Sequence, residues 1–477
     1  MPIVLLSLAA ITASLLVGLF LGVGFWQGGA ALAGIVPLVI FYALFINLSP
    51  EKKDAVFWVM FAWVIVSNIV LATTNLRLSA LLELALFLYA PLAIYFSWET
   101  IKKTPLLPFL IMLLTAYYIF AATSSIMGQS KPIATLFQMV TNLKFFLVIV
   151  IGMSLVWSEK SNRLMLWVMR WFWLPMLAMA LLQLASPSLF KLIYPFGVHS
   201  AWNDIIGMPK AAGLFRHASY LGFYSAFFMF LTLITWATTR HGRYLLLASI
   251  YFLLVILSGA RHELLSSIII AAVILTLALG KKKQGLGLRI IFGITIMLSI
   301  LGTVGITTSE YLERQALKMN IIGNKAPDQP RSVLHFDAFD IANENFPLGS
   351  GLATFGSAGA AKYDWRLYDE RGFRSFGWYE INWASDTFWP QYIAEAGWLG
   401  FIFYFSIFVV LIIYAFYMQY KTFGSNDRIY WLYAISGILM VVMLSPASPA
   451  IEDPGLALLP AIFYGIALRR QSSNVNN

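Results

Sequence analysis

The chain has 477 residues, of which 60% are hydrophobic and only 11% are charged. Soluble domains carry about 25% charged residues, so this composition excludes a water-soluble globular protein and indicates that lipid surrounds most of the chain. The net charge of +10 does not indicate nucleic-acid binding, because lysine and arginine gather in short loops between apolar stretches. The absence of cysteine excludes disulfides, thiolate metal sites and cysteine nucleophiles.

The apolar stretches predict an all-α polytopic membrane protein with about 12–14 transmembrane helices, since a crossing needs roughly 20 apolar residues. The first stretch, from Ile3 to Trp26, has no basic leading segment and no clear cleavage site, so we expect a retained helix and not a signal peptide. In chain order the predicted spans begin near Ile3, Ala30, Ala55, Ser79, Thr104, Leu136, Leu164, His217, Tyr244, Glu263, Ile290, Gly397, Ile429 and Gly455. Lys144 lies deep in the sixth span and is expected to face the bundle interior.

The loops predict the orientation, because every second loop is basic. The basic set holds Lys52/Lys53, Lys102/Lys103, Lys160/Arg163, Arg240/Arg243, Lys281/Lys282/Lys283/Arg289, Lys421/Arg428 and Arg469/Arg470. The short loops of the other set hold only Arg77, Lys131 and Arg261, or no basic residue. The positive-inside rule then places both termini in the cytoplasm.

The predicted organisation has five parts. Residues 1–186 form an N-terminal transmembrane bundle, 187–216 a periplasmic loop and 217–306 further transmembrane helices. Residues 307–396 form a large periplasmic loop, and 397–477 the C-terminal transmembrane helices with a cytoplasmic tail. The large loop is too aromatic for a disordered linker, so we expect an ordered cap that lies on the membrane.

Charged groups at the membrane surface are costly, so those on the outer side are the first candidates for chemistry. Lys210, Arg216 and His217 precede the eighth span. A planar guanidinium binds phosphate oxygens in pairs, although snorkelling to lipid head groups explains Arg216 and His217 equally well. Arg261 and His262 occupy a tight outer turn. An outer arginine runs against the positive-inside bias, so a functional role and a structural role are equally favoured there.

The large loop supplies the remaining candidates. Gly349 and Gly351 allow the backbone to approach a ligand closely, although a packed glycine turn is the simpler interpretation. Asp386 precedes the twelfth span, and Glu395 stands nearer the helix start, where the macrodipole favours a structural acid. Further candidates for substrate binding are Arg331, His335, Arg366, Arg371 and Arg374. Solvation explains most of these side chains taken singly, whereas the cluster from Asp364 to Arg374 could bind sugar hydroxyls. No metal-ligand spacing occurs in the sequence, so we expect chemistry without a metal or cofactor.

Four segments, Gly213–Arg216, Ser258–Arg261, Pro347–Gly351 and Ser385–Gly400, together resemble the landmarks of the O-antigen ligase/polymerase superfamily. The resemblance covers roughly Lys210 to Tyr417 and rests on the order and outer placement of these motifs. The ligase branch has a histidine shortly before its closing Gly-x-x-Gly motif. Asp386 stands at that place, which makes the chain more similar to polysaccharide polymerases of the Wzy type.

The resemblance implies glycosyl transfer between undecaprenyl-diphosphate-linked saccharides, in which the growing glycan moves onto the non-reducing sugar of a new repeat unit. Arg216 and Arg261 would stabilise the diphosphate leaving group, and Asp386 would orient or deprotonate the acceptor hydroxyl. The partners would be the lipid-linked donor and acceptor, and a chain-length regulator of the Wzz type is a further candidate.

Two alternatives stay open. An O-antigen ligase or oligosaccharyltransferase would move the lipid-linked glycan to lipid A core or to protein. A transporter or flippase of lipid-linked saccharides belongs to another class, which favours internal repeats and mid-membrane charges.

Overall fold

The protein is described from a computed structural model that covers residues 50–76, 78–197, 202–203, 208–280, 330–376, 385 and 387–474. In these ranges the regular secondary structure consists of helices and of two short strands, β1 (Trp202–Asn203) and β2 (Met208–Pro209), which pair antiparallel. The predicted spans near Ile3, Ala30 and Ile290, the basic loop at 281–289 and Asp386 lie outside the described residues.

Within the described ranges, eight helical segments are long and apolar enough to cross a membrane. They are α4 (Ala55–Thr74), α5 (Ser79–Lys103), α6 (Leu106–Met127), α7 (Pro132–Ser154), the pair α8 (Glu159–Trp171) and α9 (Trp173–Ala185), α11 (Ala218–Thr239), α13 (Arg261–Leu279) and α19 (Trp389–Lys421). Two shorter apolar helices are α12 (Gly242–Ser258) and α20 (Arg428–Leu444), and the last helix is α21 (Pro454–Asn474). The prediction of a polytopic helical membrane protein is therefore confirmed.

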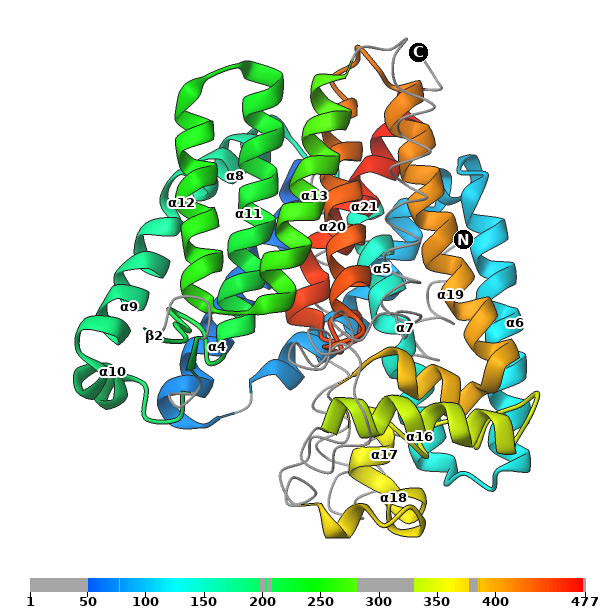
Figure 1. Cartoon of the computed structure of the whole chain (residues 1–477). Helices are drawn as coiled ribbons and strands as arrows, with labels where there is room; N and C mark the ends of the chain where they lie inside the picture. The colour runs from blue at the N-terminus through cyan, green and yellow to red at the C-terminus, as the bar shows by residue number, and fades with distance from the viewer. Residues whose placement is uncertain are drawn as a thin grey trace, which may run out of the picture.

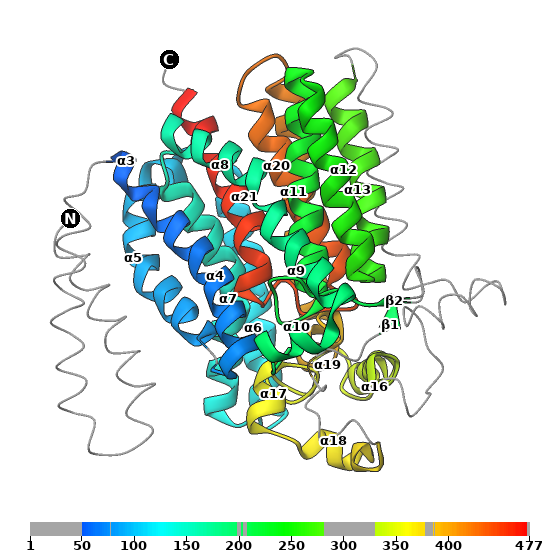
Figure 2. The ribbon, with the colours of Figure 1, turned by 90° about the vertical axis from the view of Figure 1, so that its left-hand side faces the viewer.

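The helices form one bundle with the chain's last two helices at its centre. Figure 2 shows α4 to α7 on one side and α11 to α13 on the other, with α20 and α21 between them. In agreement with this view, α21 packs against α7 and α20, and α20 packs against α11 and α13. At the crossing of α7 and α21, a Cβ on Gly152 would lie 2.4 Å from the Ile462 carbonyl oxygen, and one on Gly465 would lie 2.1 Å from that of Ile149. The two backbones therefore touch directly, as small residues permit in membrane helices.

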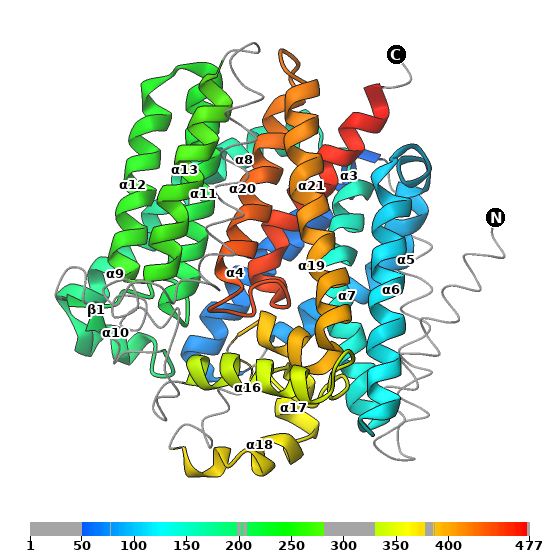
Figure 3. The ribbon, with the colours of Figure 1, turned by 45° about the vertical axis from the view of Figure 1, so that its right-hand side comes forward.

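The two predicted sets of loops lie at opposite ends of the bundle. The connections from α5 to α6, from α11 to α12 and from α19 to α20 lie at one end (Figures 1 and 3). At the other end lie α16 (Pro330–Glu344), α17 (Ala358–Tyr363) and α18 (Arg366–Glu370). The basic turns are thus segregated from the large loop, as the alternation predicts. Which end faces the periplasm stays a prediction, and we call the end with α16 to α18 the cap end.

Residues 330–376 form an ordered unit, which we call the cap. Its small core consists of Val333, Leu334, Ala338, Ile341, Phe355, Ala360, Tyr368, Phe373 and Ala394. The rings of Phe355 and Tyr368 stack at 5.0 Å, and Phe373, in the short 3-10 helix η3 (Phe373–Ser375), packs edge-on against both. Aromatic packing of this kind explains why this segment folds although it lies outside the bundle.

The long helix α19 contains a break at Gly397, whose φ of 67° and ψ of −173° are not helical. The twelfth span was predicted to begin at this residue, but the helix already begins at Trp389. A Cβ on Gly397 would lie 2.5 Å from the carbonyl carbon of Leu348. The break is therefore packed directly against the cap backbone, and no side chain fits there.

The glycine motif of the cap is hydrogen-bonded to this break. The amides of Ser350 and Gly351 donate to the carbonyl oxygens of Ala394 and Glu395, at 2.8 and 2.9 Å. The Ser124 hydroxyl on α6 contacts the carbonyl oxygens of both Gly349 and Glu395 at 2.7 Å. These bonds satisfy carbonyl groups that the helix break leaves without helical partners.

Candidate functional site

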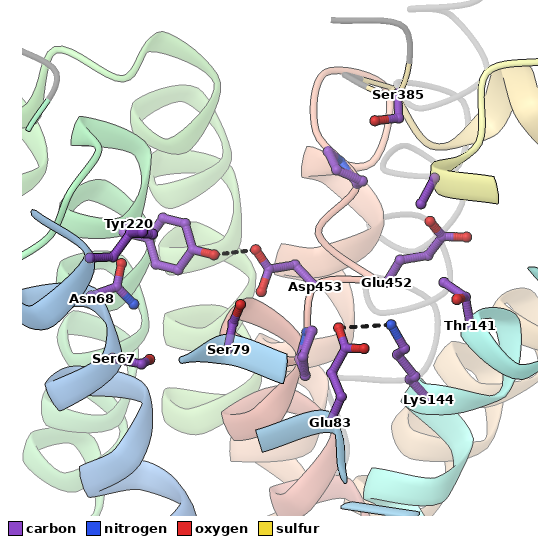
Figure 4. A pocket seen from close by; sticks show the side chains of 14 residues that line it. Ser67, Asn68, Ser79, Glu83, Thr141, Lys144, Tyr220, Ser385, Glu452 and Asp453 are labelled. Carbon is purple, nitrogen blue, oxygen red and sulfur yellow. Dashed lines mark hydrogen bonds and ion pairs between the residues drawn. The ribbon is translucent and has the colours of Figure 1, made fainter. Parts of the chain in front are cut away.

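A cavity of about 290 Å³ lies between α4, α5, the middle of α7, the first turn of α11 and the loop that joins α20 to α21 (Figure 4). The first residue of α17, Ala358, also lines it, so the cap contributes to its wall. The lining is unusually polar for a site within a membrane bundle, where unpaired polar groups are costly. Its polar residues are Ser67, Asn68, Ser79, Glu83, Thr141, Lys144, Tyr220, Ser385, Glu452 and Asp453.

One wall of the cavity carries an ion pair between two predicted spans. The Lys144 ammonium on α7 lies 2.9 Å from the Glu83 carboxylate on α5. The Lys144 side chain is 7% exposed and that of Glu83 is 35% exposed. The prediction that Lys144 faces the bundle interior is confirmed. Each charge offsets the cost of burying the other.

Glu452 is a buried carboxylate that several donors hold in place. Its Oε1 accepts hydrogen bonds from the side-chain amides of Gln138 at 2.8 Å and Gln391 at 2.6 Å, and a longer one from the Tyr392 hydroxyl at 3.4 Å. Among the described residues, all hydrogen bonds to this carboxylate end on Oε1. Burial raises the pKa of Glu452, whereas Gln391, the charge of Lys144, Gln138 and Tyr392 oppose that rise.

The neighbouring carboxylate, Asp453, is bound from two directions. The Tyr220 hydroxyl on α11 donates to its Oδ2, as Figure 4 shows. The Gly455 amide donates to Oδ1 at 2.8 Å, and the Leu456 amide donates to the main-chain carbonyl oxygen of Asp453 at 3.0 Å. Burial raises the pKa of Asp453, and these donors oppose the rise. Because amide N–H groups can only donate, both carboxylates are held as hydrogen-bond acceptors.

A second group of charges, which we call the basic cluster, consists of Lys210, Arg261, His262 and Arg331. The charges of Lys210, Arg261 and Arg331 all act on the His262 ring, and those of Lys210 and Arg331 act on the buried carboxylate of Glu263. Burial is the main cause that lowers the pKa of Lys210, and Arg331 lowers it further, while Glu263 opposes this. The structure thus brings together predicted residues from three segments that are far apart in the sequence.

His335 lies one turn beyond Arg331 on α16. Its Nδ1 is 2.8 Å from the Arg331 carbonyl oxygen, and burial lowers its pKa. His335 therefore belongs next to the basic cluster, in a mainly neutral form that adds no charge to it.

Arg216 and His217 stand where the chain enters α11. His217 is the N-cap of that helix, and its Nδ1 accepts from the Ser219 amide at 3.2 Å, which gives it a structural role. Arg216 is half-buried, and its guanidinium makes no hydrogen bond or ion pair with the residues that the structure describes. Its five donors are therefore available to a ligand.

The first turn of α11 joins the cavity to the basic cluster. Ser219 makes a side-chain hydrogen bond to Glu263, beside the cluster, and the next residue, Tyr220, donates to Asp453 in the cavity wall. A Cβ on Gly222 would lie 2.9 Å from the Ser258 hydroxyl and 3.2 Å from the Glu263 Cβ, so α11 packs closely on the α12–α13 turn. The first turn of α11 therefore contacts Glu263, beside the basic cluster, and Asp453, in the cavity wall.

The other predicted residues lie elsewhere. Gly349 and Gly351 pack against the backbone of α19 and α6, as the simpler interpretation of their motif predicts. Three of the arginines in the cap each pair with a nearby acid: Arg366 with Asp364, Arg371 with Glu344 and Arg374 with Asp369. None of these five lines the cavity. Asp386 lies outside the described residues, although its neighbour Ser385 lines the cavity.

Sequence reasoning missed Glu83, Glu452 and Asp453 as functional candidates. The signal that was present is a pair of adjacent acids between two apolar spans, in a loop that contains no basic residue. Such acids in a membrane protein call for a partner or a function. In comparisons with known proteins, no protein-family model and no curated protein matches this chain.

Proposed function

We propose that the protein is a membrane-embedded glycosyltransferase that polymerises undecaprenyl-diphosphate-linked oligosaccharide repeat units at the periplasmic face of the bacterial inner membrane. The observation that supports this proposal is that adjacent residues of α11 contact Glu263, on which the cations Lys210 and Arg331 act, and Asp453 in the cavity wall. A transferase of this kind needs a cationic site for a diphosphate and a separate polar site for a sugar hydroxyl, and this arrangement offers both.

The donor diphosphate would bind at Arg216 and the basic cluster. When the bond between the anomeric carbon and the diphosphate oxygen breaks, negative charge develops on the diphosphate, and fixed cations stabilise that charge. Arg216 makes no hydrogen bond or ion pair with the described residues, and Arg261, Lys210 and Arg331 add positive charge from other segments. Guanidinium groups bind phosphate oxygens in pairs, so these residues suit a mechanism that needs no metal.

The acceptor sugar would occupy the cavity. Its hydroxyl oxygen attacks the donor's anomeric carbon, the bond to the diphosphate breaks, and the hydroxyl proton passes to a carboxylate base. Asp386 is the base that the sequence resemblance implies. Among the described residues the best-placed base is Glu452, because its Oε2 carries no hydrogen bond from them and the residue lines the cavity. Asp453, held by Tyr220, would orient the acceptor.

Substitution of the two arginines tests the proposal. We expect Arg216→Ala and Arg261→Ala each to lower chain elongation about 100-fold or more, the usual loss when one donor to a developing anion is removed. Protein level and membrane insertion should stay normal. Arg163→Ala is the control, because this exposed arginine lies on α8 at the opposite end of the bundle. Full-length polymer from both site variants would refute the proposal.

A deletion strain separates the polymerase from the related ligase. Loss of a polymerase leaves single repeat units on the final acceptor, whereas loss of a ligase leaves long chains on the carrier lipid. Purified protein in liposomes with two lipid-linked units then separates an enzyme from a flippase. Elongation of the units supports the transferase, and translocation without elongation supports transport.

A further inference from the structure

The cavity has an excess of negative charge among the described residues that line it. Its charged residues are Glu83, Lys144, Glu452 and Asp453. Lys144 and Glu83 neutralise each other at 2.9 Å. The charge of Lys144 also acts on Glu452 and Asp453, so a single cation faces three carboxylates in the described lining.

The hydrogen-bond pattern fixes these two carboxylates as acceptors. Glu452 receives two side-chain amides on one oxygen, and one of these, from Gln138, is itself oriented by the Gly359 amide of the cap at 3.0 Å. Asp453 receives the Tyr220 hydroxyl and the Gly455 amide on different oxygens. What these carboxylates offer a ligand is therefore further acceptor capacity, which matches the donor hydroxyls of a sugar.

The size and the remaining walls fit a single sugar residue. The volume of about 290 Å³ is at the lower end of the roughly 300–1,000 Å³ typical of small-molecule pockets. Hydroxyl and amide groups from Asn68, Ser79 and Thr141 complete a lining that can both donate and accept.

We infer that the cavity binds the terminal acceptor sugar only when that sugar is uncharged, and that it rejects uronic and other acidic sugars. This inference rests on the proposed function, since it assigns the cavity to the acceptor. A sugar carboxylate held about 6 Å from Asp453 would be repelled enough to weaken binding about 100-fold, at the effective dielectric constant of a partly buried site.

The test uses two versions of the native lipid-linked unit, one with a carboxylate and one with a carboxamide on its terminal sugar. The two groups have nearly the same shape and differ in charge. The full-length protein in liposomes is given each unit, and both binding and elongation are measured. We expect the carboxamide unit to resemble the native one and the carboxylate unit to bind and react about 100-fold less well.

Two variants of the ion pair provide opposite controls. Glu83→Gln leaves the Lys144 ammonium uncompensated and should reduce the penalty on the carboxylate unit roughly tenfold. Lys144→Gln leaves the Glu83 carboxylate and should increase that penalty. Damage to the fold would lower the values for both units together, whereas a charge effect changes their ratio in opposite directions.

Equal binding of the two units, or an acidic sugar at the end of the native unit, overturns the inference. Absence of elongation with every unit contradicts the proposed function instead, and the ratio of the two binding constants then still decides whether the cavity selects by charge.

Discussion

The contact between the cap and the break in α19 makes Gly349→Ala a severe substitution. The added methyl group would lie 2.2 Å from the carbonyl oxygen of Ala394 and 2.5 Å from the amide nitrogen of Gly397. Both are backbone atoms, so rotation of a side chain cannot relieve the contact. Ordinary contacts between carbon and oxygen are about 3.3 Å or longer, which means that the two segments must separate by about 1 Å.

That separation breaks the hydrogen bonds that join the segments. The bonds from Ser350 and Gly351 are 2.8 and 2.9 Å long, and an extra 1 Å takes both beyond the usual limit of about 3.2 Å. Each lost bond costs about 1 kcal/mol, and overpacking a tight contact costs about 1–3 kcal/mol. We expect Gly349→Ala to lower the free energy of unfolding by about 3–5 kcal/mol.

Unfolding in mixed micelles, followed by tryptophan fluorescence, measures this loss. Gly242→Ala is the matched control, because a Cβ at Gly242 meets no atom within 4 Å and the residue begins a helix. The control should be neutral or slightly stabilising. If Gly349→Ala unfolds like the wild type but no longer elongates glycan, the packing argument is wrong and the ligand-binding role predicted from the sequence gains support.

Three further predictions concern the cavity and the cap. Tyr220→Phe removes a donor to the buried Asp453 carboxylate and should destabilise the protein by about 1–3 kcal/mol in the same unfolding assay; unchanged stability would show that water replaces the bond. Burial raises the pKa of Glu452 above 4.5, so the folded state favours the protonated side chain. The stability that Glu452 contributes is therefore greatest at pH values below its pKa in the unfolded chain, and it is lost as the pH rises through its pKa in the folded protein. The melting temperature of Glu452→Gln should therefore fall less than that of the wild type as the pH rises above 4.5, and parallel curves would contradict this. Arg374→Gln breaks a pair with Asp369 in which the arginine is 72% exposed, so stability should change by less than about 1 kcal/mol; a large loss of elongation would instead assign Arg374 the substrate contact predicted from the sequence.

The span pattern was predictable because it depends on composition along short windows. Each predicted span that begins between Ala55 and Glu263, or at Gly397 and beyond, corresponds to a described helix or helix pair. The start of α19 was displaced, because Trp389 to Ala396 is a separate helical piece before the Gly397 break. Hydropathy does not distinguish a helix that begins at a glycine from one that is broken there.

The site was predictable only in part, because its partners come from distant segments. Arg216 and Arg261 were recognised as individual outer cations. The relation of the basic cluster to the cavity depends on α11, whose first turn contacts Glu263 beside the cluster and Asp453 in the cavity wall. The donors to Glu452, on α7 and α19, are separated from it by 314 and 61 residues. A local sequence pattern cannot predict hydrogen bonds between residues so far apart in the chain.

The contacts of α7 have a consequence for the insertion of the chain into the membrane. Lys144 pairs with Glu83 on α5, and α5 is synthesised before α7. The charge of Lys144 can therefore be neutralised as soon as α7 enters the membrane. Gln138, on the same helix, bonds to Glu452, which is made only near the end of translation. The close backbone contact between Gly152 and α21 also forms only after α21 has been synthesised. A nascent chain therefore holds a charge-balanced but incomplete α7 until its last hairpin arrives, and the cavity exists only in the finished protein.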